Sequence, residues 1–211
     1  MATPGTPFLG LALHTTTPQL GLSIKNITTK EQHTAVWDLG RGLSAELHCY
    51  LQDFIQPYHW QDVAFLGVAK GPGGFTGTRL GVVTARTLAQ QLEIPLYGIS
   101  TLAAIAFRVA QDNLDQAIAV YLPARRGAVF GAIYQITTTG VKSLVPDQLF
   151  TPEAWADCQQ NFADLQVIEP PETLGDTAAE ILSLAQQQWQ LDPQGPWGAV
   201  VPFYGQHPVH R

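Results

Sequence analysis

The run Val63-Ala-Phe-Leu-Gly-Val-Ala69 contains no polar residue. A strand that faces water on one side alternates apolar and polar residues, so a continuous apolar run is typical of a strand buried on both faces. Such burial requires helices on both sides of a sheet. The run therefore predicts an α/β fold in which a sheet is covered by helices and this strand lies near its centre.

Three shorter strand candidates precede that run. Residues 8–13 are continuously apolar, residues 20–27 alternate, and residues 33–39 form a weaker candidate. The short gaps between them favour an antiparallel meander. The spacing of apolar residues then changes. Between 43 and 55 they recur at helical spacing and form one stripe. We therefore expect a first helix that ends at Pro57.

Strands and helices then alternate. A helix is expected from about Thr76, a plausible N-cap, to Leu92, followed by a strand over 94–99 and a third helix capped by Ser100. The resulting order, βββαβαβα, indicates a mixed sheet with helices on both faces. It is typical of the ribonuclease H-like unit found in actin-like ATPases, the ASKHA group.

The second half of the chain begins the pattern again. Strands are expected at 117–122, 128–137, 141–145 and 165–168, and helices at 152–160 and 173–189. This second lobe looks truncated relative to the first. We therefore expect two lobes, residues 1–105 and residues 106–211, with an irregular docked tail from 196 onward.

Composition narrows the function classes. The chain has 211 residues, with 11 Lys and Arg against 17 Asp and Glu, a net charge of −6. A protein that binds phosphate backbones alone normally shows a basic surplus, so autonomous nucleic-acid binding is disfavoured. Only 13% of the residues are charged, which suggests that a partner covers part of the surface. Two cysteines, no basic N-terminal region and no apolar window of about 18 residues predict a cytoplasmic protein without a membrane span.

The segment Gly71-Pro-Gly-Gly-Phe-Thr-Gly-Thr-Arg-Leu-Gly81 joins a buried strand to a helix. Backbone N–H groups and the helix dipole favour anions at such a place, so Gly73 and Gly74 are candidate phosphate or partner contacts. The segment is neither a P-loop nor the dinucleotide fingerprint, because the Lys-Ser/Thr pair and the third glycine are missing. A tight turn without a ligand explains the first glycines equally well.

Small residues line one face of the helix that follows. Gly77, Gly81 and Ala85 are spaced at i, i+4 and i+8, although an interior glycine costs about 1 kcal/mol relative to alanine. This spacing predicts close approach of another backbone, either the first helix of this chain or a helix of another chain. The candidate interface comprises Leu43, Leu47, Tyr50, Leu51, Phe54, Phe75, Thr76, Gly77, Arg79, Leu80, Gly81, Thr84, Ala85 and Leu88.

The glycine segment, together with Thr84-Ala-Arg-Thr-Leu-Ala89 and Ile94-Pro-Leu-Tyr-Gly-Ile-Ser-Thr-Leu102, closely resembles the TsaB (YeaZ) family. Ala124-Arg-Arg-Gly-Ala-Val-Phe130, Gly10-Leu-Ala-Leu-His-Thr-Thr-Thr17 and Val201-Pro-Phe-Tyr204 are similar to further segments of that family. The resemblance covers nearly the whole chain and is weakest over 140–195.

The resemblance implies a non-catalytic scaffold subunit in the synthesis of N6-threonylcarbamoyladenosine beside the tRNA anticodon. It implies pairing with the transferase subunit TsaD through the first two helices, with homodimers using the same surface. It also implies contact with the ATPase TsaE and a functional link to TsaC, with tRNA bound only through the complex. No cofactor is expected on this chain alone, and ATP or ADP is expected only at an interface with partner subunits.

Three positions depart from the family pattern. His14 and Pro123 stand where the family usually has Asp, and Leu43 stands where it often has His. Phosphate chemistry on an actin-like fold needs carboxylates at the first two positions. The departures therefore favour a subunit without catalysis over the alternative of a small kinase or ATPase acting alone. A freestanding homodimer with its own binding role stays open.

Other candidate sites are weaker. His207 and His210 lie three apart beside Pro208, and no ligand spacing for a metal occurs in the sequence. Arg125 and Arg126 are candidates for contact with a phosphate or with a partner carboxylate, and simple solvation of a turn is an equal alternative.

Overall fold

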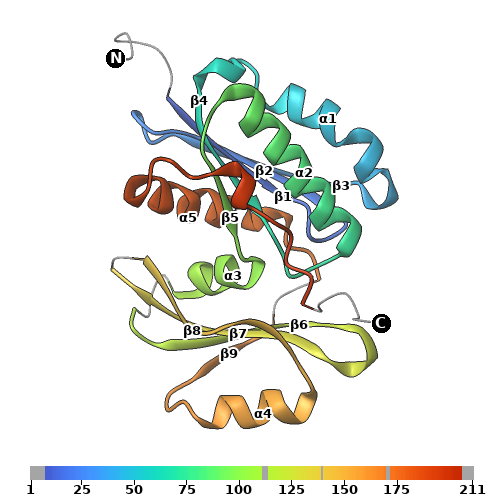
Figure 1. Cartoon of the computed structure of the whole chain (residues 1–211), viewed down its shortest axis with the longest axis vertical. Coiled ribbons are helices and arrows are strands. Elements are labelled where there is room, and N and C mark those ends of the chain that lie inside the picture. The colour runs from blue at the N-terminus through green and yellow to red at the C-terminus, as the bar shows by residue number, and fades with distance from the viewer. Residues whose placement is uncertain (1–7, 111–113, 139, 170–171, 206–211) are drawn as a thin grey trace.

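A computed structural model describes residues 8–110, 114–138, 140–169 and 172–205. Two sheets form, and together with their helices they confirm an α/β fold with mixed sheets (Figure 1). The first sheet contains β1 (Leu9–His14), β2 (Gln19–Asn26), β3 (Gln32–Asp38), β4 (Val63–Ala69) and β5 (Leu96–Ile99). The second contains β6 (Ala117–Pro123), β7 (Val129–Thr137), β8 (Gly140–Phe150) and β9 (Gln166–Ile168).

The strand order of the first sheet is β3-β2-β1-β4-β5, with β3-β2-β1 antiparallel and β1, β4 and β5 parallel. The run over 63–69 is therefore an interior strand, as its lack of polar residues predicts. The second sheet has the order β8-β7-β6-β9, again with an antiparallel meander, but with one parallel strand where the first sheet has two.

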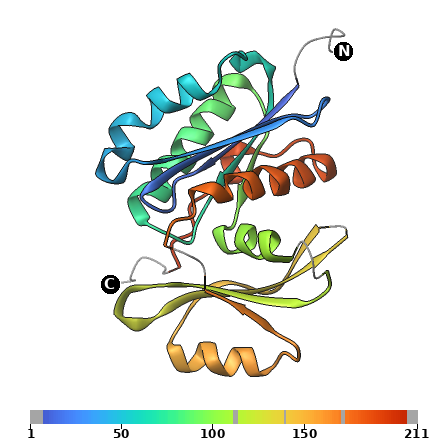
Figure 2. The same cartoon turned by 180° about the vertical axis from the view of Figure 1, so that it is seen from behind.

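Helices separate and cover the sheets in layers (Figures 1 and 2). The helices α1 (Leu43–Phe54) and α2 (Phe75–Leu92) cover one face of the first sheet, and α5 (Ala178–Leu191) covers the other. The helix α3 (Thr101–Val109) lies between α5 and the second sheet, and α4 (Pro152–Gln160) covers the outer face of that sheet.

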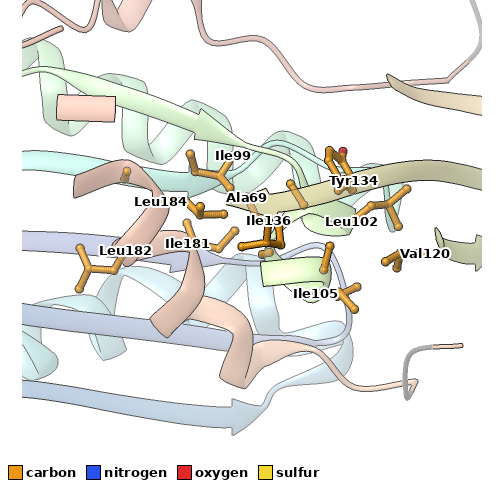
Figure 3. Close-up of a cluster of buried hydrophobic side chains, with 14 of the residues drawn as sticks. Ala69, Ile99, Leu102, Ile105, Val120, Tyr134, Ile136, Ile181, Leu182 and Leu184 are labelled. Carbon is orange, nitrogen blue, oxygen red and sulfur yellow. The ribbon is translucent and has the colours of Figure 1, made fainter. Parts of the chain in front are cut away.

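One apolar cluster joins the two sheets through α3 and α5. Figure 3 shows Ile181 and Leu184 of α5 beside Ile99 of β5, with Leu102 of α3 and Tyr134 of β7 continuing the cluster. The last helix therefore packs on the first sheet, although the division at 105/106 assigns it to the second lobe. The apolar stripe of the last helix predicts that the helix is buried. It does not predict which sheet covers it, because that depends on how the chain runs from β9 back to the first sheet.

Two helix starts test the expected caps. Ser100 caps α3, since its Oγ accepts hydrogen bonds from Leu102 N at 3.1 Å and Ala103 N at 3.2 Å. Thr76 does not cap α2: the helix begins at Phe75, and Gly74 is the N-cap residue without a side-chain bond. The last helix begins at Ala178, after a short 3₁₀ turn over Gly175–Thr177, rather than at 173.

Candidate functional site

The loop between β4 and α2 packs on the turn that follows β1. Gly74 N donates a hydrogen bond to the Thr16 carbonyl oxygen at 2.7 Å, and a Cβ on Gly73 would lie 2.5 Å from that same oxygen. These two glycines are thus needed for a close approach within the chain. The N–H of Gly74 is already bonded, so it is not free to bind a phosphate.

The small-residue face of α2 is filled by the same turn. A Cβ on Gly77 would overlap the Thr15 carbonyl oxygen, and a Cβ on Gly81 would overlap Thr15 Oγ1. Thr15 Oγ1 also donates a hydrogen bond to the Gly77 carbonyl oxygen at 2.8 Å. The expected close neighbour is therefore the β1–β2 turn. The helix α1 lies farther away: its Leu43 Cδ2 is 3.6 Å from the Cβ position of Gly77.

The apolar stripe of α1 belongs to the core of the chain. Leu47 is fully buried, and the other apolar residues of the stripe pack with it against β1, β2 and β4. Three expected interface residues on α2, namely Gly81, Thr84 and Ala85, are likewise buried. Seven of the expected interface residues are thus buried within the chain: Leu43, Leu47, Leu51, Phe54, Gly81, Thr84 and Ala85. Their spacing therefore indicates burial, and they are covered by this chain's own first sheet and its β1–β2 turn.

A different face of α2 is accessible. Phe75 and Val83 are each 58% exposed, and with Arg79 they follow the spacing i, i+4 and i+8. The Arg79 guanidinium lies 5.3 Å from the centre of the Phe75 ring, and Leu80 is half-buried beside this stripe. We call Phe75, Arg79, Leu80 and Val83 the outer stripe of α2. Sequence reasoning missed Val83, because it followed the small residues to the buried face.

The remaining expected interface residues are accessible to different degrees. Thr76 is exposed, while Tyr50, Gly77 and Leu88 are half-buried. Tyr50 packs on Trp37 of β3, with ring centres 5.0 Å apart. The outward face of α1 is polar and includes the acidic residues Glu46 and Asp53, whereas α2 contains no acidic residue. The exposed faces of these two neighbouring helices therefore differ in charge.

The ends of β1 and β6 carry no carboxylate. His14 is fully buried at the end of β1, its Nε2 lies 3.0 Å from Thr16 Oγ1, and its Nδ1 has no hydrogen-bond partner among the described residues. Burial lowers the pKa of His14 to about 4, so the ring is neutral near pH 7. Pro123 ends β6 and is exposed.

The C-terminal segment docks beside the β4–α2 loop, as the sequence predicts for the tail. Phe203 N donates to the Lys70 carbonyl oxygen at 2.7 Å, and the Phe203 ring lies 6.2 Å from that of Phe130. Tyr204 packs on Phe75, with ring centres 5.3 Å apart. The segment thus contacts both α2 and the second sheet. His207 and His210 lie outside the described residues.

A partly buried polar cluster joins the second sheet to the start of α3. The Tyr134 hydroxyl donates to Asp147 Oδ1, and it lies 3.2 Å from Ser100 Oγ. Burial raises the pKa of Asp147, although bonds from Ser100 and Tyr134 and the charge of Lys70 oppose the rise. Sequence reasoning missed this cluster, because its members are isolated in sequence and meet only through the pairing of β7 with β8.

The described residues contain neither a metal site nor a membrane-spanning helix. No group of three or more His, Cys, Asp or Glu side chains is placed to hold a metal ion. Within the same residues, every helix is too short or too polar to cross a membrane.

Comparison with known proteins identifies the family. A family model described as TsaD, tRNA N6-adenosine threonylcarbamoyltransferase, matches residues 57–207. The tRNA threonylcarbamoyladenosine biosynthesis protein TsaB of Bacillus subtilis is 38% identical over 97 residues, which are 46% of this chain and 42% of that protein. The protein of the same name from Escherichia coli is 36% identical over 80 residues, 38% of this chain and 35% of that protein. The matched segments thus span less than half of these relatives.

The fold agrees with that assignment. YeaZ from Pseudomonas aeruginosa superposes with a TM-score of 0.77 at 20% identity, over 93% of this chain and 99% of the other. A second structure from that organism, an uncharacterized protein similar to peptidase YEAZ, gives a TM-score of 0.79 over 94% of this chain and 100% of the other, again at 20% identity. Because the family model covers most of the sequence, this chain belongs to the family that the model describes as TsaD, and its named relatives place it with the TsaB (YeaZ) proteins of that family.

Proposed function

We propose that this chain is a non-catalytic subunit of the machinery that makes N6-threonylcarbamoyladenosine in tRNA, and that it pairs with the transferase TsaD and activates it. The names of the curated relatives support the pathway. Membership of the family that includes the transferase supports a partner of related fold. TsaE and TsaC are the further components of this machinery, and the cytoplasm is where it acts.

The outer stripe of α2 carries the proposal of a partner surface. Single exposed apolar side chains are ordinary, but Phe75, Leu80 and Val83 are neighbours on one face of one helix, and a contiguous exposed apolar patch indicates an interaction surface. The neighbouring outward face of α1 adds Glu46 and Asp53, which suit a polar rim. The docking surface that we propose is therefore centred on Val83 and extends to Arg79, Leu80, Thr76 and Leu88.

The strand ends support the absence of catalysis. A neutral, buried His14 and an exposed Pro123 cannot hold a hydrated cation as carboxylates would. We therefore propose that no nucleotide is turned over by this chain alone, and that ATP or ADP binds at an interface with partner subunits. We further propose that the two sheets are the centres of two ribonuclease H-like lobes of an actin-like fold. The lobes divide near 105/106, and α5 packs on the first lobe although it follows the second in sequence.

Light-scattering chromatography of this chain with TsaD from the same organism tests the proposal. The pair is expected to elute as an equimolar complex. Val83→Asp places an unpaired charge at the centre of the docking surface and is expected to weaken pairing by about thirtyfold or more, the effect of truncating one central interface residue. Val167→Asp on β9 is the matched control, because Val167 is similarly exposed, at 49%, on another element.

Two outcomes would contradict the proposal. A mixture that elutes as the sum of its parts would show that this chain does not pair with TsaD. Equal affinities of the Val83→Asp and Val167→Asp variants would move the docking surface away from α2. A self-dimer of the isolated chain that dissociates when TsaD is added would agree with one surface serving both partners.

A further inference from the structure

Charge is distributed very unevenly along the chain. The segments 63–92, 116–146 and 193–211 contain seven of the 11 Lys and Arg residues and none of the 17 Asp and Glu residues. All of the acidic residues, and only four basic ones, therefore lie in the rest of the sequence. The net charge of −6 does not reveal that basic and acidic residues are separated in this way. A basic cluster on one face is a stronger indication of polyanion binding than the net charge of the chain.

Parts of these three segments meet in the fold. The start of α2, the β6–β7 turn and the C-terminal segment lie on the same side of the molecule in both views (Figures 1 and 2). Contacts join them: Tyr204 packs on Phe75 at 5.3 Å, and Phe203 packs on Phe130 at 6.2 Å. Phe130 pairs with Leu122 near the end of the hairpin, so its turn lies close to the C-terminal segment.

The β6–β7 turn presents two unpaired guanidinium groups. Arg125 and Arg126 form a 3₁₀ turn closed by a hydrogen bond from Ala124 N to the Ala128 carbonyl oxygen at 2.8 Å, and both side chains are exposed. Arg126 has a φ of 58°, a left-handed conformation that is unfavourable for a residue other than glycine. Both ion pairs found among the described residues use Arg108, so neither arginine of the turn is neutralised.

An accessible aromatic ring lies on the same face. Tyr204 is 43% exposed although it packs on Phe75, and Arg79 lies over the other ring of this pair. Exposed rings beside guanidinium groups suit the stacking of unpaired bases, while the guanidinium groups suit phosphates. A purely acidic protein surface would use the charges but would leave the Tyr204 ring without a specific role.

We propose that Arg125, Arg126 and Tyr204, here called the basic face, bind a single-stranded loop of RNA. Arg125 and Arg126 hold phosphates, and Tyr204 stacks on an unpaired base. This inference rests on the proposed function, since the RNA would be the tRNA presented to the paired transferase. The acidic remainder of the chain keeps its own affinity for RNA low, so the basic face contributes only within the complex.

The test measures RNA affinity of the complex with TsaD. A fluorescein-labelled anticodon stem-loop is titrated with the complex over a range of salt concentrations. Arg125→Gln/Arg126→Gln is expected to weaken binding and to lower the salt slope by about 0.7 to 0.9 for each phosphate that is no longer neutralised. Tyr204→Ala is expected to weaken binding about fivefold or more, the lower end for one stacked base, whereas Tyr204→Phe keeps the wild-type affinity.

The matched control is Lys25→Gln/Lys30→Gln, which removes two cations from β2 and the following turn, outside the basic face, and is expected to leave RNA affinity unchanged. Pairing with TsaD and the Tm are measured for every variant. Unchanged RNA affinity of the Arg125→Gln/Arg126→Gln complex would overturn the inference and leave the proposed function standing. Weakened pairing in that variant would instead assign the face to an acidic protein surface. A wild-type chain that does not pair would overturn both.

Discussion

Thr15 Oγ1 donates a hydrogen bond to the Gly77 carbonyl oxygen at 2.8 Å, and the same hydroxyl occupies the space next to Gly81. One turn residue thus joins the end of β1 to the first two turns of α2. This contact orients α2 on the sheet, and it turns the opposite side of the helix, with Phe75 and Val83, toward the surface.

Gly77→Ala is expected to destabilise the chain by about 1–3 kcal/mol, the usual cost of overpacking. The new Cβ would overlap the Thr15 carbonyl oxygen, a backbone atom that cannot rotate away. This loss is net of the gain of about 1 kcal/mol in helix propensity. Urea unfolding measures it. Gly198→Ala is the control, because no atom lies within 4 Å of its Cβ position, and equal stabilities of the two variants would refute the close contact.

Leu47→Ala is expected to lower the free energy of unfolding by about 2–5 kcal/mol, because Leu47 is fully buried against the first sheet. His48→Ala, at the next and exposed position of α1, is expected to change it by less than about 0.5 kcal/mol. If Leu47→Ala instead left stability unchanged and weakened partner binding, the α1 stripe would be an interface and not core.

His14 predicts a pH dependence. Its folded pKa of about 4 lies below the unfolded value of 6.5, so the unfolded chain binds more protons between these values. The stabilisation is therefore present above pH 6.5 and is lost as the pH falls toward 4, by about 2–3 kcal/mol at pH 4.5. His14→Gln is expected to lose less stability between pH 7 and 4.5. Parallel curves for the two chains would contradict the burial of a neutral ring.

Asp147→Asn is expected to stabilise the chain more at pH 7 than at pH 4. Burial raises the folded pKa of Asp147 above its unfolded value, so the folded state binds more protons and stability falls as the pH rises through the folded pKa. An amide at this position carries no charge and removes that loss. Thermal unfolding at several pH values measures the difference, and an equal effect at both pH values would show that Asp147 titrates normally.

Much of the fold can be read from the sequence. The absence of polar residues over 63–69 gives an interior strand, and the helical spacing over 43–55 gives the bounds of α1 closely. These features depend on local periodicity, which a single sequence contains. The family can also be recognised, because the segment 71–81 is long and specific.

The sequence alone could not predict which residues are exposed on the surface or which neighbours cover the others. Glycines at 77 and 81 correctly indicate a close approach, but their nearest neighbour is Thr15, which is 62 residues from Gly77 and is brought there by the parallel pairing of β1 with β4. Likewise, the apolar stripe on α1 predicts that this face is buried but does not predict which element covers it. Val83 and the pair Tyr134–Asp147 have no local signal, because only the tertiary structure exposes the first and joins the second.

Reconstitution of the tRNA modification tests whether this chain activates TsaD. Threonylcarbamoyladenosine formation is measured with TsaC, TsaD, TsaE and tRNA while this chain is titrated. Little product is expected without the chain, saturation when chain and TsaD are equimolar, little rescue by equimolar Val83→Asp, and full rescue by Val167→Asp. Full modification without the chain, or ATP turnover by the isolated chain, would contradict the proposed function.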